Sequence, residues 1–340
     1  MQGSDRHSIA RAIERWFARH QRPLPWRERY DPFHVWVSEV MLQQTRMEVV
    51  LPYFERFVER FPTLDALAAA TEDEVMAAWS GLGYYRRARM LREGAIAVVE
   101  RFEGRVPKSV DDLLALPGIG RYTAGAIASV AWNRRAPIVD GNVARILSRL
   151  FAIDAPLASP ALMREAWARE EELVAACTKP RDFNQGLMEV GALICTPRNP
   201  SCLACPVRAH CATRGDHLPR AKEKKATRAM RIPLYLITDR RGRVLMRRES
   251  GPLMNAMLHL PHGDTSLLTG RPLAVTAKAL LGTFRHTVTT RRIEFALYAA
   301  NARNPKRREY VWIDPEAMSE VPHPSYVAKA LRLWCGREET

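Results

Sequence analysis

Four of the six cysteines lie close together in the sequence, with a spacing typical of a metal site. They follow the pattern C-x6-C-x2-C-x5-C and are Cys195, Cys202, Cys205 and Cys211. Cys177 and Cys335 lie apart from them. Disulfides are rare inside cells, so a compact set of thiols in a cytosolic protein favours metal binding. Spacing alone allows either a zinc ion or an iron–sulfur cluster.

A glutamate lies inside an apolar helical segment, where it could exchange a proton near neutral pH. Glu39 stands between Val37 and Val40 in the sequence WVSEVMLQQT. If its carboxyl is buried, the loss of hydration raises its pKa, and the group can act as a general acid. The alternative is a glutamate that faces solvent on an amphipathic helix. Gln44 and Thr45, which follow, are candidates for contacts with base edges.

A second carboxylate precedes a predicted helix. Asp140 follows the apolar residues Ile138 and Val139 and precedes Gly141 and Asn142. A carboxylate with apolar neighbours is costly unless it is hydrogen-bonded or used in chemistry. It could also cap the helix that begins near Asn142. The two roles are compatible, because a carboxylate fixed at a helix start has a defined position, where we expect it to remain ionised.

The sequence LPGIG at residues 116–120 predicts a tight turn between two helices. Gly118 and Gly120 allow backbone conformations and close approaches that other residues resist. The unpaired N–H groups at the start of the second helix then attract an anion. This helix-hairpin-helix arrangement binds a DNA phosphate without reading sequence. An ordinary turn between two helices is the alternative.

Basic and aromatic residues also favour a partner made of phosphates and bases. The net charge is +15 and the isoelectric point is near 10.0, which suits a polyanion, although a basic protein with no such partner is the alternative. In GLGYYRRAR, residues 81–89, tyrosines alternate with arginines. Tyr84 and Arg86 are therefore candidates for base stacking and phosphate binding, with core packing as the alternative for the tyrosines.

The 340 residues suggest about two domains. Helical periodicity and caps, such as the box Thr71–Glu74, predict an all-α domain over residues 1–213. Residues 214–231 carry seven basic and two acidic residues, a charge of +5, and predict a basic linker. No apolar run approaches the ~20 residues of a membrane span. The first residues lack the apolar core of a signal peptide, so we expect a cytoplasmic protein.

Residues 232–340 predict a smaller α+β domain. The alternation from Ile232 to Leu236, a turn at 239–242 and the apolar run that follows at Val244 predict a β-hairpin. Further strands are expected near residues 293–297 and 310–313, before a closing helix from Ser325 to Cys335.

These motifs, in this order, resemble those of the helix-hairpin-helix DNA glycosylases over residues 8–212. More narrowly, the chain is similar to the branch that removes adenine opposite 8-oxoguanine, and LPWR at 24–27 and FNQGLMEVGALICTP at 183–197 add to the likeness. The resemblance implies an all-α glycosylase domain with a [4Fe–4S] cluster on the four cysteines, followed by an α+β Nudix-like domain that recognises the lesion. It also implies that the partner is duplex DNA with A:8-oxoG or A:G mispairs, bound by a monomer associated with the nucleoid.

The resemblance also implies roles for single residues. Glu39 would protonate the adenine and then help to activate water, and Asp140, beside Asn142, would stabilise the positive charge on the sugar. Tyr122 would help to place that charge. The residues expected to contact bases are Arg27, Gln44, Thr45, Leu82, Tyr84, Gln185, Phe284 and His286. Those expected at the DNA backbone are Gly118, Gly120, Arg86, Arg121 and Arg285.

One position separates two kinds of relative. Bifunctional enzymes such as endonuclease III carry a nucleophilic lysine where this chain has Tyr122, and Arg121 cannot replace it because guanidinium does not lose its proton. We therefore predict hydrolysis that leaves an abasic site, with no lyase step. A bifunctional lyase is one alternative. A non-catalytic iron–sulfur DNA-binding protein is another, but it would not need both Glu39 and Asp140.

The second domain departs from the pattern of its relatives at two places. Where the relatives have a tryptophan-rich segment, this chain reads MNAMLHLPHG at residues 254–263, and Arg285 stands where they have a serine between Phe284 and His286. A Nudix hydrolase needs several glutamates for Mg²⁺. Residues 246–281 contain only Glu249 and Asp264 as acids, so we expect no pyrophosphatase activity.

Overall fold

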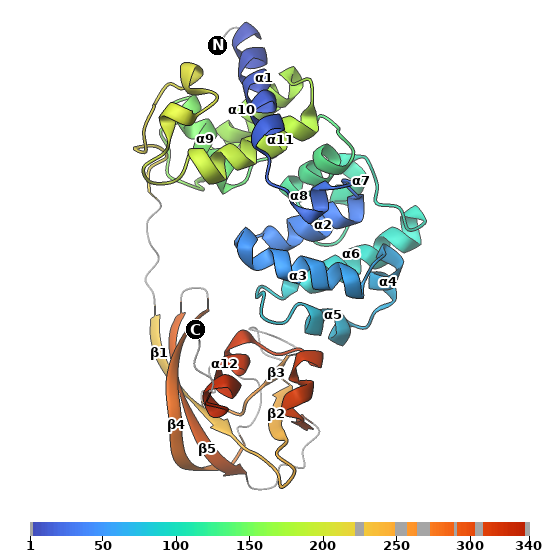
Figure 1. Cartoon of the computed structure of the whole chain (residues 1–340), viewed down its shortest axis with the longest axis vertical. Helices are drawn as coiled ribbons and strands as arrows, with labels where there is room; N and C mark the ends of the chain where they lie inside the picture. The colour runs from blue at the N-terminus through green and yellow to red at the C-terminus, as the bar shows by residue number, and fades with distance from the viewer. Residues whose placement is uncertain are drawn as a thin grey trace. The chain divides into compact units, whose positions relative to one another are not determined.

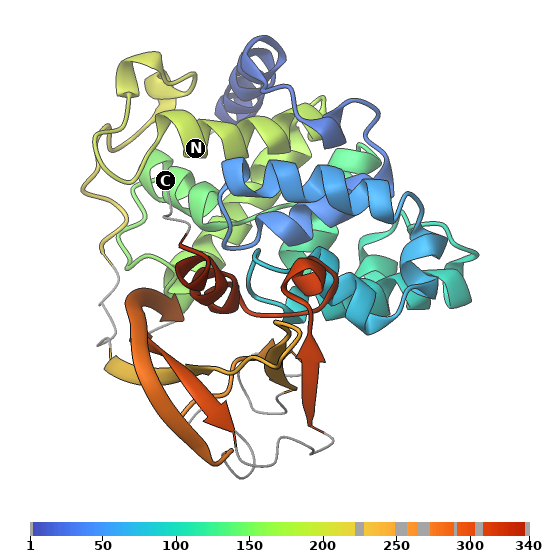
Figure 2. The same cartoon turned by 60° about the horizontal axis from the view of Figure 1, so that its bottom comes forward.

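The computed structural model divides the chain into two compact units (Figures 1 and 2). It describes residues 3–221, 228–248, 257–263, 273–288, 291–302 and 309–336. The first unit comprises Met1–Val50, Thr63–Ala68 and Glu93–Glu223, and the second comprises Leu51–Pro62, Ala69–Arg92 and Lys224–Thr340. Residues 222–227 of the predicted linker, residues 254–256, Glu249 and Asp264 lie outside the described residues.

The chain up to residue 213 is mainly helical, as the sequence predicts, and residues 214–221 form no helix. Its α-helices are α1 (Gly3–His20), α2 (Pro32–Leu42), α3 (Met47–Arg60), α4 (Leu64–Ala69), α5 (Glu72–Ala78), α6 (Arg86–Phe102), α7 (Val110–Leu114), α8 (Arg121–Ala126), α9 (Gly141–Leu150), α10 (Pro160–Ala176) and α11 (Pro180–Glu189). Shorter turns are the 3-10 turns η1 (Pro25–Arg27), η4 (Cys202–Ala204) and η5 (Arg208–His210), and the π-helical turns η2 (Ile127–Ala131) and η3 (Val190–Ile194).

Side-chain caps set where several of these helices begin. Asp31 accepts from the amides of Phe33 and His34 at 2.9 and 3.0 Å, with Pro32 at the first helical position of α2. Thr71 and Glu74 form the predicted capping box of α5. None of the helices in the described ranges has the length and apolar character that a membrane crossing requires.

The core of the first unit is formed by α1, α9, α10 and α11 (Figure 1). Apolar side chains from all four helices are buried there, among them Ile9, Leu147, Leu162 and Phe183. Helix α11 approaches α1 closely, because Gly186 has no side chain to separate the two helices. This core supports the start of α9, where Asp140 lies.

Residues 136–139 form an extended segment that leads directly to Asp140, and we call it the approach segment. Ala136, Ile138 and Val139 are buried and Pro137 is half-buried, yet the segment belongs to no helix or strand. Asn184 on α11 donates to the carbonyl oxygen of Ala136 at 2.8 Å. On another side, α8 lies so close that a Cβ on Gly125 would stand 2.1 Å from the carbonyl oxygen of Pro137. Packing, rather than backbone pairing, therefore holds this segment.

The C-terminal part of the second unit contains two small sheets. The first sheet has the order β1-β5-β4 and the second has the order β3-β2-β6. Strand β1 pairs with β5 in parallel, whereas the other pairs are antiparallel. The strands are β1 (Arg228–Leu236), β2 (Val244–Arg248), β3 (Leu258–His259), β4 (Val275–Val288), β5 (Arg291–Ala302) and β6 (Tyr310–Ile313). In Figure 2 the orange strands β4 and β5 run side by side and bend.

The predicted hairpin after Leu236 is only partly correct. The turn exists, since the amide of Asp239 donates to the carbonyl oxygen of Arg243 at 3.0 Å. Next to the turn, the amide of Leu245 donates to the carbonyl oxygen of Ile237 at 2.9 Å. Farther away the strands separate, and β1 pairs with β5 while β2 joins the other sheet. The turn signal is local, whereas pairing partners are chosen by long-range packing. Strand β1 also begins at Arg228, inside the segment for which the sequence predicts a linker.

The predicted closing helix is α12 (Ser325–Trp334), which follows the 3-10 helix η6 (Pro315–Glu320) and packs on the first sheet. Tyr326 stacks on Phe295 of β5 with ring centroids 4.6 Å apart. Leu333 fills the space beside Gly282 of β4. One face of this sheet is therefore an aromatic and aliphatic core.

Gly125→Ala is expected to lower the free energy of unfolding, because its Cβ would meet the carbonyl oxygen of Pro137. Overpacking of this kind costs about 1–3 kcal/mol, which outweighs the roughly 1 kcal/mol that alanine gains over glycine in a helix. Urea unfolding followed by circular dichroism measures the difference. Gly120→Ala is the control, since nothing lies within 4 Å of its added Cβ, and an equal loss in both variants would contradict the argument.

Candidate active site

Glu39 and Tyr122 meet in the interior of the first unit. Glu39 on α2 is 6% exposed, so the prediction of a buried glutamate is confirmed and the solvent-facing alternative is wrong. Its Oε2 accepts a hydrogen bond from the Tyr122 hydroxyl on α8 at 2.9 Å. Burial raises the pKa of Glu39 to about 7; the charge of Asp140 adds to the rise, and the Tyr122 hydroxyl and Arg27 oppose it. Glu39 can therefore both give and take a proton near neutral pH.

Tyr122 acts as a hydrogen-bond donor to this carboxyl and stays protonated. Its hydroxyl also lies 3.2 Å from the sulfur of Met188. Burial, the nearby carboxyls of Glu39 and Asp140 and its hydrogen bond to Glu39 hold the pKa of Tyr122 well above its usual value. The position at which a lysine would be a nucleophile thus holds a neutral phenol.

Asp140 caps α9, as one of the two predicted roles requires. Its Oδ1 accepts from the amide of Val143 at 2.7 Å, and its Oδ2 accepts from the Asn142 side chain at 3.1 Å. Burial nevertheless raises the pKa of Asp140 above its usual value, although these hydrogen bonds and Arg145 act in the opposite direction. The expectation that Asp140 remains ionised rests on its place at the helix start, and burial acts against it.

A buried arginine links Asn142 to the cysteine segment. Arg145 on α9 donates to Asn142 Oδ1 at 3.0 Å, and to the carbonyl oxygens of Gly191 and Cys195, both at 2.7 Å. Asn142 in turn donates to Asp140. Hydrogen bonds therefore run without a break from the backbone of Cys195 to the carboxyl at the site.

Arg27 and Gln185 also lie together, at one side of the first unit. Arg27 on η1 donates to Gln185 Oε1 at 2.8 Å and forms a short ion pair with Glu189 on α11. Gln185 is 2% exposed and Glu189 is 1% exposed. The Oε2 atom of Glu189 has no hydrogen-bond partner among the described residues. The cluster thus contains a buried acceptor that is not satisfied by the protein.

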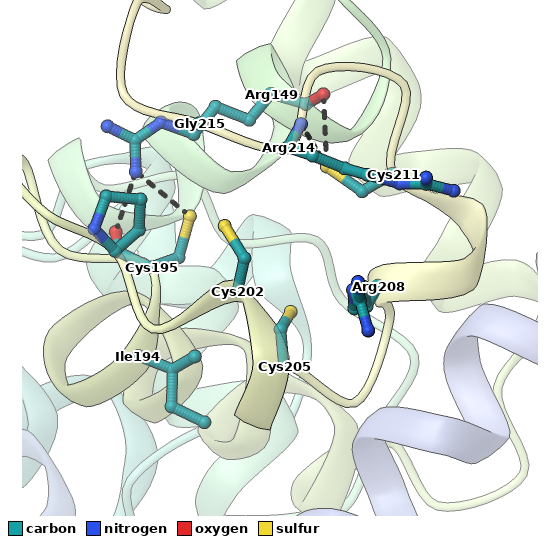
Figure 3. A pocket seen from close by; sticks show the side chains of 10 residues that line it. Arg149, Ile194, Cys195, Cys202, Cys205, Arg208, Cys211, Arg214 and Gly215 are labelled. Carbon is teal, nitrogen blue, oxygen red and sulfur yellow. Dashed lines mark hydrogen bonds between the residues drawn. The ribbon is translucent and has the colours of Figure 1, made fainter.

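The four clustered cysteines line one pocket (Figure 3). None of the four forms a disulfide with another described cysteine. Arg149 donates to the Cys195 sulfur at 3.2 Å, and the amide of Arg214 donates to the Cys211 sulfur at 3.5 Å. The remaining lining residues are Ile194, Pro200, Arg208 and Gly215. Four thiols with guanidinium groups beside them suit a group that carries negative charge.

The predicted base-contacting residues after α2 and α5 lie outside the helices and differ in their exposure. Gln44 is exposed and has a φ of 57°, directly after α2, and Thr45 donates to the carbonyl oxygen of Gln43 at 3.3 Å. Leu82 is buried, whereas Tyr84 is 48% exposed with a φ of 50°.

The arginines of residues 81–89 divide between solvent and structural roles. Arg86 is exposed. Arg87 stacks on Tyr84 and Trp79, with 5.4 Å to each ring centroid. Arg89 pairs with Glu72 at 2.6 Å. Of the three, Arg86 is therefore the arginine that this segment presents outward.

The predicted helix-hairpin-helix turn is present. Gly118 has a φ of 75°, which favours glycine, and Gly120 caps α8 without any side-chain hydrogen bond. Arg121 points back to α10, where its guanidinium lies 3.8 Å from the Trp167 ring centroid and pairs with Glu171. No side chain of the N-cap residue therefore competes for the backbone amides at the start of α8.

The segment Phe284–Arg285–His286 lies on β4, with side chains on alternating faces. Phe284 and His286 are half-buried and Arg285 is exposed. His286 lies 6.0 Å from the Tyr326 ring, between centroids. Burial and the charge of Lys329 lower the pKa of His286. Arginine and histidine at these neighbouring positions therefore face different surroundings.

Sequence reasoning missed the burial of several charged residues, among them Arg145, Glu170 and Glu189. A signal existed for two of them. Glu189 follows Gln185 by four positions, and Arg145 follows Asp140 by five, between the apolar residues Ala144 and Ile146. Charged residues on the buried face of a helix are rarely tolerated unless paired. Glu170, among exposed acids on α10, gave no such signal.

Comparison with known proteins is consistent with this geometry. The family described as "HhH-GPD superfamily base excision DNA repair protein" matches residues 37–169. A solved structure described as a thermostable thymine-DNA glycosylase has a TM-score of 0.55 and 28% identity, covering 62% of this chain and 97% of that one. The helical part of the chain therefore has the fold of helix-hairpin-helix glycosylases.

Similarity to two curated relatives shows the family to which the chain belongs. A human adenine DNA glycosylase is 46% identical over 208 residues, or 58% of this chain, but the match spans only 38% of the human protein. The adenine DNA glycosylase of Mycolicibacterium smegmatis is 40% identical over 254 residues, which cover 72% of this chain and 82% of that protein. The chain belongs to the adenine DNA glycosylase family.

Proposed function

We propose that the chain excises adenine from duplex DNA, opposite 8-oxoguanine and guanine, by hydrolysis that leaves an abasic site. The observation that carries this proposal is the buried Glu39 carboxyl, with a pKa near 7, bonded to Tyr122 and close enough to Asp140 to be affected by its charge. Enzymes that break glycosidic bonds typically use two carboxyl groups in unequal environments.

The reaction begins when the adenine leaves the base stack, since its glycosidic bond is inaccessible inside a duplex. Protonated Glu39 then donates its proton to N7 and makes the base a better leaving group. Asp140, held by Val143 and Asn142, stabilises the positive charge that develops on the sugar. The Glu39 carboxylate, now without its proton, activates the water that attacks the sugar.

Arg27, Gln185 and Glu189 are the proposed binding site for the extruded adenine. Adenine offers ring nitrogens as acceptors and an exocyclic amine as donor. Arg27 and Gln185 supply donors. The unsatisfied Oε2 of Glu189 supplies an acceptor for the amine. A base without that amine would leave a buried oxygen unpaired, which is how such a site discriminates.

Tyr122 supports hydrolysis rather than lyase chemistry. A lyase needs an amine that attacks the sugar to form a Schiff base. Tyr122 has no amine, and its hydroxyl is engaged as a donor to Glu39. The proposed product is therefore an abasic site in an unbroken strand.

We also propose that Cys195, Cys202, Cys205 and Cys211 hold a [4Fe–4S] cluster. When bound, such a cluster ties four points of the chain together through thiolate bonds. Arg149, which donates to the Cys195 sulfur, would offset part of the cluster's negative charge. Arg145 would then keep Asn142 and Asp140 in register with the cluster-bearing segment.

The C-terminal part is proposed to be a Nudix-like module that distinguishes 8-oxoguanine from guanine, without pyrophosphatase activity. 8-Oxoguanine carries a carbonyl at C8 and a proton on N7. Arginine has no acceptor atom, so it cannot accept a hydrogen bond from that N7–H. The exposed position of Arg285 supports a contact with the DNA backbone instead. Gln44, Thr45, Leu82 and Tyr84 are proposed to act beside the partner base.

We propose a monomer that works on the nucleoid in the cytoplasm.

Glu39→Gln is expected to slow single-turnover adenine release by about 10²–10⁴-fold, because glutamine has no proton to donate. Asp140→Asn should cause a loss of the same order or larger. The wild-type rate should fall as pH rises through about 7, since Glu39 then loses its proton. Duplexes with A:8-oxoG, A:G and A:T pairs measure rate and specificity, and duplex binding should survive in both variants.

The matched control for this experiment is Glu48→Gln, which changes an exposed glutamate on α3. It should excise adenine like the wild type. An E39Q variant that works at the wild-type rate would contradict the role of Glu39. Covalent trapping of the wild type on DNA by borohydride would contradict the hydrolytic product.

Metal analysis of anaerobically purified protein is expected to find about four iron atoms per chain and no stoichiometric zinc. Serine at any one of the four clustered cysteines should lower the iron content. Cys335→Ser and Cys177→Ser should leave it unchanged, since neither thiol lines the pocket. Zinc in place of iron would show that the other metal allowed by the spacing is correct.

Arg285→Ala is expected to weaken binding to A:8-oxoG and A:G duplexes about equally, and to reduce the salt dependence of log K by about one. His286→Ala should instead narrow the difference between the two duplexes. Binding curves at several salt concentrations separate the two effects. If Arg285→Ala removed only the preference for 8-oxoguanine, arginine would be the residue that reads the lesion.

A further inference from the structure

Glu170 on α10 is a fully buried acid that the proposed reaction does not use. Its exposed fraction is 0%. Neither carboxyl oxygen has a hydrogen-bond partner in standard geometry within the described part of the chain. Burial raises the pKa of Glu170 well above its usual value, and the backbone amide of Ile138 partly offsets this rise. An acid in such a position is stable only while it carries a proton.

The Glu170 carboxyl lies close enough to the backbone amide of Ile138 to be affected by it. Ile138 belongs to the approach segment and precedes Asp140 by two positions. Two other helices already hold that segment, through the Asn184 side chain at Ala136 and through Gly125 against Pro137. Glu170 adds a contact from α10. The backbone that delivers Asp140 to the site is thus enclosed by three helices.

Within the described ranges, no cation forms an ion pair with this acid. Arg121 on α8 is the one positive group that acts on its pKa, and the effect is the smallest of the four causes. Arg121 is already paired with Glu171 and stacked on Trp167. Glu171 itself raises the pKa of Glu170, and Cys177, beyond the end of α10, is also within range of its charge. An ionised Glu170 would therefore be an uncompensated buried charge.

We propose that Glu170 is a positioning residue for adenine excision, whose neutral carboxyl supports Ile138 and thereby fixes the backbone that presents Asp140. This inference rests on the proposed function, because it concerns the placement of Asp140. The neutral form fills its space beside the Ile138 backbone. The ionised form would draw in water or push the segment away. Either movement would displace Asp140 from the sugar.

Single-turnover excision by three variants tests the positioning role. Glu170→Ala removes the support, and it should slow adenine release about tenfold or more, since small displacements of a catalytic group can cost up to ~10²-fold. Glu170→Gln keeps the shape and an oxygen without the charge, so it should restore the rate to within about threefold of wild type. Glu165→Gln, at an exposed position on the same helix, is the control and should match the wild type. Duplex affinity should stay within about twofold in all three.

The pH dependence of unfolding supplies a second measurement that does not involve activity. A carboxyl whose folded pKa is raised stabilises the fold relative to its ionised form below its unfolded pKa, near 4.5, and this contribution is lost as pH rises toward the folded pKa. Wild type should therefore lose stability relative to Glu170→Gln between pH 5 and pH 8. Glu165→Gln should follow the wild type throughout.

These outcomes separate the inference from the proposed function. A wild type that excises no adenine would overturn the function and the inference together. A wild type that excises adenine, with Glu170→Ala equally fast, would overturn the inference alone. Should Glu170→Ala fail to fold, Glu170→Gln still decides, because unfolding free energies that run parallel to wild type from pH 5 to pH 8 would overturn the inference.

Discussion

The dehydration of the Glu39 carboxyl is the constraint on which the arrangement of α2, α8 and α9 depends. A rise in pKa from 4.5 to about 7 corresponds to roughly 3 kcal/mol in favour of the protonated form. This rise is possible only because α2 is apolar on almost every side, from Phe33 to Met41. Tyr122 supplies a hydrogen bond to the carboxyl without bringing water or a positive charge. The site thus keeps a proton available where water would remove it.

The Asp140 carboxyl is also removed from water, but it has a different set of partners. A helix start, an amide side chain and a nearby guanidinium oppose the effect of burial on this carboxyl. Each partner belongs to α9, so the helix positions the acid and moderates its acidity at once. Because Asp140 is tied to α9, any shift of that helix would also move Asp140. The surrounding helices α8, α10 and α11 pack around the approach segment and limit such a shift.

The sequence was most informative where chemistry depends on local order. The apolar surroundings of Glu39, the cap at Asp140 and the spacing of the four cysteines could all be recognised within ten or twenty residues. Contacts between distant segments could not. That Arg121 turns to Glu171, or that Glu170 lies beneath Ile138, depends on how α10 packs, which no local pattern encodes. The parallel pairing of β1 with β5 is another long-range choice, invisible to the hairpin signal beside it.

Arg149 limits the conformational freedom of the chain that carries the clustered cysteines. Its guanidinium donates to the carbonyl oxygens of Pro197 at 3.0 Å and Leu218 at 2.6 Å, at the two ends of that segment. The residues between them contain only the short turns η4 and η5 within the described chain. Closing a flexible loop of about twenty residues costs roughly 2–3 kcal/mol of chain entropy. The Arg149 side chain, which is buried, holds the two ends of this loop together and thereby offsets part of that cost.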